Sequence, residues 1–185
     1  MHAGLMRSCL LLASLLLGAC ATLPTPQPAD LGLRLSPASL GASIARQQHL
    51  KVERAGRIDE LDAALEVDTE HLQLVGLAFG QRVLSLSYDG KELKSWRHFM
   101  LPSQVRAEDV LQDLQLTLWP QEAIRLALPA GWTLEDDGLR RTLYMGGTVV
   151  TVIDYSAMPR WSGTVRLDNL RYQYRLTIQS APSGP

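Results

Sequence analysis

Apolar and polar residues alternate in short runs from His49 onward, and turn-forming residues separate the runs. Runs of this length and period predict β-strands. The first five predicted strands cover residues 49–54, 58–67, 71–78, 82–88 and 92–98. Asp89-Gly90 lies between the last two and predicts a two-residue hairpin turn, because a type I′ turn needs positive φ at both central positions. We therefore expect residues 50–99 to form an antiparallel meander.

The pattern changes to a helical period between residues 101 and 131. Val110, Leu111, Leu114 and Leu118 fall on one face of a helix. Ser103 is a suitable N-cap, and acidic residues follow it early enough to favour the helix dipole. Pro120 should end this helix and start a second one over residues 121–128, which Pro129 and Gly131 stop.

Strand patterns return after Gly131, over residues 132–135, 139–145, 148–155, 163–167 and 171–179. Asp137-Gly138, Gly146-Gly147 and Asp168-Asn169 are the expected turns. In the last strand Tyr172, Tyr174, Leu176 and Ile178 share one face, so that face should meet a core and the other face water. We expect about ten antiparallel strands, and a curved sheet of that many strands either closes, splits or leaves a concave apolar face, for which the helices are the natural cover.

The first 20 residues contain a basic residue, an apolar run over residues 10–17 and two small residues before Cys20. This is the pattern of a secretory signal peptide, and its apolar core is too short to remain as a transmembrane helix. We expect a signal peptide over residues 1–19, a Pro-rich tether over 20–44 and one domain over 45–181.

Leu17-Gly18-Ala19-Cys20 resembles the bacterial lipobox, which implies cleavage before Cys20 and lipidation of Cys20. An ordinary signal peptide that happens to contain a cysteine is the alternative. Ala21 stands where an Asp would signal inner-membrane retention in enterobacteria-like lipoproteins. By that resemblance the protein is anchored in the periplasmic leaflet of the outer membrane.

Charge and motif content exclude several classes of function. Eighteen basic and nineteen acidic residues, without long runs of one sign, disfavour nucleic-acid binding and a mainly electrostatic grip on anionic lipids. The sequence has no nucleophile elbow, no phosphate-binding Gly-rich loop and no metal-ligand spacing among its histidines. We expect no catalytic residues, no metal, no cofactor and no enzyme activity, although a metal site assembled only in space stays open.

The strand order with a helical insertion, behind a lipobox and a Pro-rich tether, is similar to the LolA/LolB family of lipoprotein carriers. This similarity implies the fold class: mainly β (α+β), an open, strongly curved antiparallel sheet of about ten strands, a half-barrel, with the helices as a lid. Phe79-Gly80 falls between the third and fourth strands, where LolB has an exposed Leu-Gly hairpin loop, and Met158-Pro159 resembles LolB's closing section. The stretch EVDTEHLQLVGLAFGQRVLSLSYDGKEL is similar to a group of bacterial lipoproteins of unknown function, often encoded beside aryl polyene or fatty-acid-like synthesis genes.

This resemblance implies that an acyl or polyene lipid binds in an apolar cavity and is inserted into the outer membrane, with a periplasmic LolA-like carrier as a possible partner. Phe79 and Gly80 would form the membrane-insertion loop. The candidate lid and cavity residues are Val110, Leu111, Leu114, Leu118 and Trp119. A non-carrier assembly lipoprotein, whose sheet is filled by its own side chains and whose Phe79 meets a protein, is the alternative, and an enzyme acting on envelope lipids is a third. Phe79 could also fold back and seal the end of the sheet.

Overall fold

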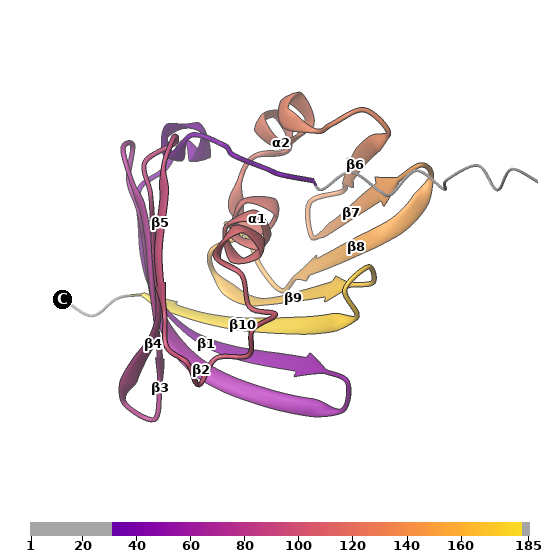
Figure 1. The fold of residues 1–185 in the computed structure, drawn as a ribbon. Coiled ribbons are helices and arrows are strands. Elements are labelled where there is room, and N and C mark those ends of the chain that lie inside the picture. The colour runs from indigo at the N-terminus through magenta and orange to yellow at the C-terminus, as the bar shows by residue number, and fades with distance from the viewer. Residues whose placement is uncertain (1–30, 183–185) are drawn as a thin grey trace, which may run out of the picture.

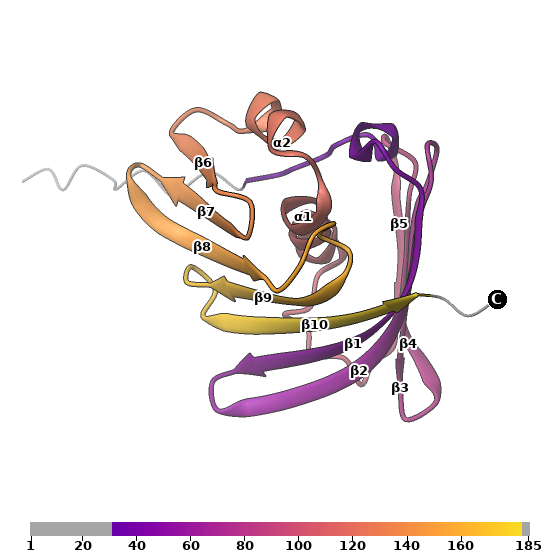
Figure 2. The same ribbon diagram turned by 180° about the vertical axis from the view of Figure 1, so that it is seen from behind.

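The structure is a computed structural model that describes residues 31–182 (Figures 1 and 2). Ten strands form one sheet in the order β5-β4-β3-β2-β1-β10-β9-β8-β7-β6, and every neighbouring pair is antiparallel. The strands are β1 (Ile44–Arg54), β2 (Arg57–Val67), β3 (Leu72–Ala78), β4 (Gln81–Tyr88), β5 (Leu93–Arg97), β6 (Trp132–Asp136), β7 (Arg140–Met145), β8 (Thr148–Tyr155), β9 (Gly163–Asn169) and β10 (Tyr174–Pro182). The helices are the 3₁₀ turn η1 (Pro37–Leu40), α1 (Ala107–Leu118) and α2 (Gln121–Ala127).

The sheet curves around α1. β3, β4 and β5 stand on one side of the helix and β6, β7 and β8 on the other, while β1 and β10 join the two halves (Figure 1). α1 therefore lies inside the concave side, and α2 covers the β6 end (Figure 2). The open, curved antiparallel sheet with a helical covering, expected from the sequence, is confirmed.

Alternation along the strands sends apolar residues to the concave face and charges to the convex one. The concave face contributes buried residues to a single core, among them Leu74, Leu86, Ile153 and Leu167. On the convex face, ion pairs run from strand to strand. The chain of pairs is Arg140–Asp154 (2.7 Å), Asp154–Arg166 (2.8 Å), Arg166–Asp168 (3.3 Å) and Asp168–Arg175 (2.6 Å). The convex face therefore faces water, and each of these half-exposed pairs adds only a few tenths of a kcal/mol to about 1 kcal/mol.

Three predicted turns have different outcomes. Gly146-Gly147 is a two-residue turn with both φ angles positive (56° and 80°), as predicted. The two-residue turn at Asp89-Gly90 is wrong: the loop spans residues 89–92, because the Asp89 carboxylate accepts the backbone N–H groups of Lys91 (2.8 Å) and Glu92 (2.7 Å).

The predicted turn at Asp168-Asn169 is also wrong, because both residues belong to β9 and the turn covers residues 170–173. Asn169 faces inward, where its side-chain amide donates to the Tyr174 hydroxyl (3.1 Å) and its carbonyl accepts the Tyr172 N–H (2.9 Å). Tyr172 is therefore a turn residue and not part of the last strand's inner face, which Tyr174, Leu176 and Ile178 form.

The start of α1 differs from the prediction as well. Arg106 occupies the N-cap without a side-chain hydrogen bond, so Ser103 is not the cap. Backbone turns at Leu101 and Val105 place Ser103 before the helix begins. Glu108 and Asp109 lie in the first turn of α1, and Pro120 directly precedes α2, as expected.

Candidate functional site

α1 fills the concave face of the half-barrel. Leu111 and Trp119 are fully buried, Leu114 and Leu118 are nearly so, and Val110 packs against the same core. Val110, Leu111, Leu114 and Leu118 thus lie together on one face of α1 within the core, whereas Trp119 follows the helix as its C-cap. In this arrangement the apolar face on which a cavity was expected is occupied by the protein's own side chains.

The C-terminal end of α1 is fixed by a buried cation that the sequence did not reveal. The guanidinium of Arg141, 1 % exposed, donates to the carbonyl oxygens of Leu116 (2.5 Å) and Trp119 (2.9 Å) and to the carboxylate of Asp136 (2.9 Å). Arg160 donates to the same carboxylate at 2.8 and 2.5 Å. Because the last carbonyls of a helix lack intrahelical partners, these contacts cap α1 and tie it to β6 and β7.

Asp113, in the middle of α1, faces β9 and β10. It accepts a hydrogen bond from the hydroxyl of Tyr174 on β10, which in turn accepts one from Asn169. Burial raises the pKa of Asp113 to about 7, against its ordinary value of 3.8, and the nearby Asp109 adds to the rise, while the Tyr174 hydrogen bond opposes it. The pair is a buried polar contact that joins α1 to β9 and β10.

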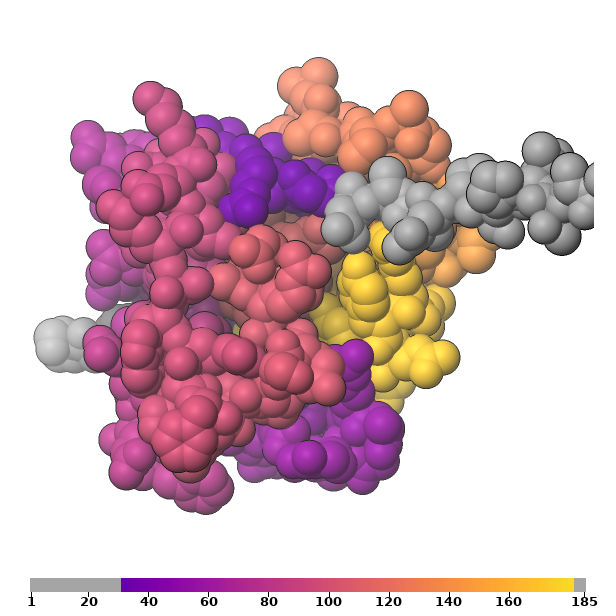
Figure 3. Space-filling model, viewed as in Figure 1, coloured from indigo at the N-terminus to yellow at the C-terminus, as the bar shows by residue number. Residues whose placement is uncertain are grey.

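Residues 31–36, which we call the strap, cross over α1 before η1 (Figures 1 and 3). Leu31, Leu33 and Leu35 are buried in the core, and the residues between them are exposed. Two glutamines of α1 hold its backbone. The side-chain oxygen of Gln112 accepts a hydrogen bond from the Gly32 N–H (3.2 Å). The side-chain amide of Gln115 accepts one from the Leu35 N–H (3.1 Å) and donates one to the Leu35 backbone carbonyl (2.9 Å). Residues 31–40, which lie inside the segment expected to be a tether, therefore belong to the folded body.

Trp119 adds a further connection at the end of the strap. Its indole N–H donates to the carbonyl oxygen of Ser36 (3.1 Å) and to the Ser39 hydroxyl (3.0 Å). The residue predicted to contact a cavity therefore anchors the strap and η1 to the end of α1.

One end of the sheet exposes a group of large apolar side chains. Phe79 is 98 % exposed and Phe99 88 %, and Leu77, Trp96 and Met100 are 38–49 % exposed. Antiparallel pairing places them at one end, since the His98 N–H donates to the Val83 carbonyl (2.9 Å) next to the β3–β4 hairpin. We call these five residues the apolar end, which lies at the bottom of Figure 1. Exposed apolar groups of this kind are typical of contact sites.

Phe79 adopts a backbone conformation that bulky residues rarely accept. Phe79 and Gly80 form a two-residue turn with φ angles of 51° and 72°, the sign pattern of a type I′ turn. Ala55 and Gly56 form the equivalent turn between β1 and β2, with 49° and 77°. Because its side chain is almost fully exposed, Phe79 does not fold back to seal the sheet.

Cations border the apolar end. The guanidinium of Arg82 lies 4.9 Å from the centre of the Trp96 ring, and Arg97 donates to the Pro102 carbonyl oxygen (2.9 Å). The rings of His98 and Phe99 are 4.3 Å apart. The end therefore combines aromatic rings with positive charge, a combination that suits a membrane–water interface.

A family of proteins described as "Protein of unknown function (DUF3261)" matches residues 45–182 of this chain. The chain belongs to this family. The DUF3261 match spans nearly all of β1 through β10 and begins after the strap. No curated protein matches the chain.

Two solved structures resemble the DUF3261 chain at low identity. One is a LolA superfamily protein, NE2245 from Nitrosomonas europaea, with 10% identity, a TM-score of 0.44, and coverage of 85% of this chain and 96% of that one. The other is a DUF1329 family protein from Desulfovibrio piger, with 11% identity, a TM-score of 0.35, and coverage of 82% and 89%.

Two shallow hollows lie at the surface of the DUF3261 chain. One, of about 280 Å³, is lined by residues of β1, β2 and the start of β3. The other, of about 650 Å³, lies between the β1–β2 and β9–β10 turns and includes Tyr174. Within residues 31–182, no helix is long and apolar enough to span a membrane, and no three His, Cys, Asp or Glu side chains are placed to hold a metal ion.

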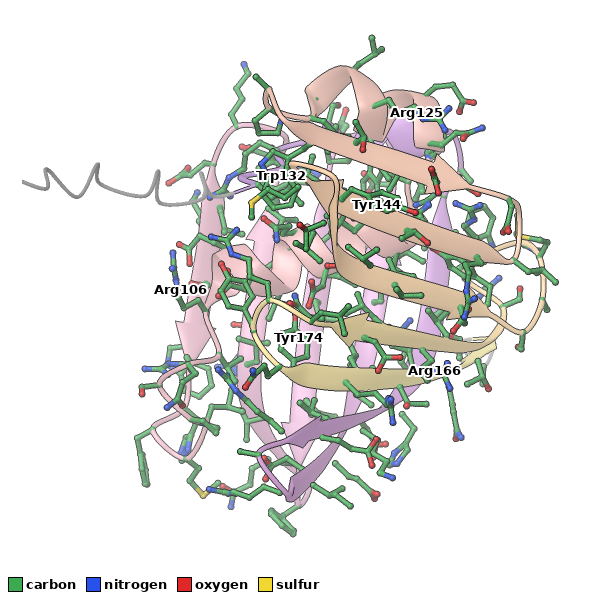
Figure 4. The ribbon with its side chains drawn as sticks, turned by 90° about the vertical axis from the view of Figure 1, so that its right-hand side faces the viewer. Arg106, Arg125, Trp132, Tyr144, Arg166 and Tyr174 are labelled. Carbon is green, nitrogen blue, oxygen red and sulfur yellow. The ribbon has the colours of Figure 1, made fainter. Side chains whose placement is uncertain are left out.

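The two edges of the sheet differ. Arg125 on α2 donates to the Leu134 carbonyl of β6 (3.1 and 3.0 Å), so this edge is partly covered (Figure 4). β5, at the other edge, carries the half-exposed Trp96. Uncovered edge strands offer free backbone groups for pairing, which makes the β5 side the more accessible one.

Cys20, the predicted site of lipidation, lies outside the described residues, as do the signal segment and residues 20–30. Sequence reasoning missed Arg141, Asp113 and the two strap-binding glutamines. The burial of Arg141 could have been predicted, because it lies two positions before Leu143 and therefore on the same inward face of the strand. The strap could have been predicted from its leucines, which alternate at positions 31, 33 and 35.

Proposed function

We propose that this DUF3261 protein is a lipoprotein anchored through Cys20 in the periplasmic leaflet of the outer membrane, where it receives an acyl or polyene lipid and helps insert it into that membrane. The observation that carries the proposal is the apolar end, above all a fully exposed aromatic residue held in an unfavourable conformation at a hairpin tip. Strain that the fold tolerates at a surface position supports a functional role for that position.

The apolar end is suited to contact with a bilayer. Transfer of a fully exposed aromatic side chain into an apolar medium is favourable by about 1.5–3 kcal/mol. Phe79 and Phe99 together would contribute about 3–6 kcal/mol by that measure. This is enough to orient an anchored protein on the membrane, although it is weak as the sole means of attachment.

The concave face is the proposed place for the lipid chain. It presents leucine, isoleucine and valine from both halves of the sheet. A chain of sixteen methylenes gains roughly 13 kcal/mol on leaving water, at about 0.8 kcal/mol per methylene, without any specific contact. Since α1 and the strap occupy this face, lipid uptake requires one of them to move. A LolA-like carrier in the periplasm is the partner we propose for loading.

The test is mass spectrometry of lipids extracted from the mature protein purified from its own host, with Cys20→Ser so that the anchor contributes nothing. A lipid present in stoichiometric amount supports carriage and identifies its chemical class. A protein that is empty, and that also fails to bind a fluorescent sixteen-carbon fatty acid, would refute it.

A second function is favoured by the filled concave face. If neither α1 nor the strap leaves the concave face, the protein is an assembly lipoprotein that uses the apolar end to bind another protein. The two functions differ in vesicle binding: the purified Cys20→Ser protein should bind lipid vesicles through Phe79 if it is a carrier, and should ignore them if Phe79 meets a protein.

A further inference from the structure

We infer that the strap occupies the binding site of the lipid chain, so that the acyl or polyene ligand binds where Leu31, Leu33 and Leu35 now lie and displaces them. This inference rests on the proposed function and names the place and the gate of its binding site. Three observations support it: how the strap is held, what shape it has, and where it leads.

The strap is attached to α1 by side chains and not by a strand. No backbone pairing of residues 31–36 with a sheet strand occurs within the described part of the chain. The Gly32 and Leu35 N–H groups go instead to Gln112 and Gln115, one helical turn apart on α1. A permanent element of the core would gain more from a sheet ladder, which satisfies every second backbone group on its side.

Gln115 is chemically suited to a binding site that the strap covers and uncovers. Its amide is completely buried beneath the strap and satisfied by both polar groups of Leu35. A buried amide without a partner is unfavourable, but removal of the strap would expose the same group to water, or to the ester or carboxyl group of a bound lipid. The Gln115 amide therefore has hydrogen-bond partners in both states.

The shape of the strap matches a linear apolar ligand. Its three leucines point to one side of an extended backbone, over about 13 Å from Leu31 to Leu35 at roughly 3.3 Å per residue. The binding site is therefore long and narrow, and core residues line its inner side. An alkyl or polyene chain fits such a binding site, whereas a compact ligand does not.

The strap also leads to the predicted anchor. Cys20 precedes Leu31 by eleven residues, which reach at most ~36 Å when extended. Because the strap is covalently continuous with the segment that bears Cys20, displacement of the strap changes how freely the body moves relative to the membrane.

The first experiment uses the wild-type mature protein with Cys20→Ser and measures amide hydrogen exchange with and without saturating palmitic acid. We expect the Gly32 and Leu35 amides to exchange faster when lipid is bound, because both lose their glutamine partners. Unchanged or slower exchange at these two amides, with lipid demonstrably bound, would overturn the inference and leave the proposed carriage intact.

The second experiment compares the affinity of a fluorescent sixteen-carbon fatty acid for two variants. L31A/L33A/L35A should bind at least about tenfold more tightly than the parent, because a competing occupant is weakened. Leu139→Ala, at an exposed leucine in the turn between β6 and β7, is the control and should leave affinity unchanged.

The outcomes distinguish failure of the strap inference from failure of the proposed lipid carriage. If the parent binds lipid and the strap variant binds no better, the strap inference fails alone. If neither folded protein binds the probe, the proposed carriage fails, and the strap inference with it. Should the triple variant not fold, Leu33→Ala alone replaces it, with the same expected direction.

Discussion

Replacement of Phe79 by Asn should make the protein more stable and less able to bind membranes. Phe79 lies in the left-handed region at φ 51° and its side chain is 98 % exposed, so it contributes almost no packing to the fold. The left-handed conformation costs a residue with a β-carbon roughly 1–2 kcal/mol, and Asn accepts it more readily than other such residues. We expect Phe79→Asn to raise the free energy of unfolding by about 1 kcal/mol, or Tm by about 2–4 °C.

The same substitution should weaken binding to vesicles. Insertion of one exposed phenylalanine ring contributes about 1.5–3 kcal/mol, so its loss should reduce the partition constant by about 10- to 100-fold. Binding is measured by co-sedimentation of the Cys20→Ser protein with large unilamellar vesicles, and stability by urea unfolding of the same samples. The opposite signs of the two changes distinguish a functional strained residue from a structural one.

Ala55→Asn provides the matched control. Ala55 occupies the same position of the equivalent turn between β1 and β2, with φ 49°. It should gain a similar amount of stability and leave vesicle binding unchanged. Vesicle binding by Phe79→Asn at the wild-type level, or a loss of stability in that variant, would refute the reasoning.

Two further predictions concern the attachment of α1. Arg141→Ala removes the cap on the Leu116 and Trp119 carbonyls and one partner of Asp136, so unfolding by urea should show a loss of about 3–5 kcal/mol, against less than about 1 kcal/mol for the exposed neighbour Arg140→Ala. A small loss at Arg141 would mean that the cap is dispensable. Burial raises the pKa of Asp113 from 3.8 to about 7, so between these values the folded state binds a proton that the unfolded state releases, and stability should fall as pH rises from about 4 to about 7. The full effect is about 4 kcal/mol, and Asp113→Asn should remove this part of the pH dependence; an identical profile in the variant would contradict the assignment.

The alternation of apolar and polar residues was sufficient to predict the ten strands and the helical insertion, whereas the open, curved form of the sheet was expected from the resemblance to the LolA/LolB family. Period-2 patterning depends on residues a few positions apart, and so does turn chemistry at Gly146-Gly147. The errors at Asp89 and at Asp168-Asn169 arose where a side chain competes with the backbone. The Asp89 carboxylate lengthens its loop, and Asn169 is drawn inward by Tyr174.

The parts of the site that escaped prediction depend on contacts between distant segments. The strap is held by Gln112 and Gln115, about eighty positions away, and Arg141 is buried only because the end of α1 needs donors. The hairpin at Phe79 was predictable from its position between two strand patterns. Its exposure and its left-handed backbone were not, since both depend on the turn geometry and on what the neighbouring elements leave uncovered.

The pairing of β1 with β10 at the centre of the sheet sets the order in which the protein can be built during synthesis. Each half is a series of neighbouring hairpins, but Leu50 pairs with Ile178, so the join between the halves waits for nearly the last residues of the chain. A chain that emerges amino-terminus first must therefore hold β1 as an unpaired edge until β10 arrives, and such edges favour aggregation. For this fold, protection by a chaperone matters most in the interval before the final strand is delivered.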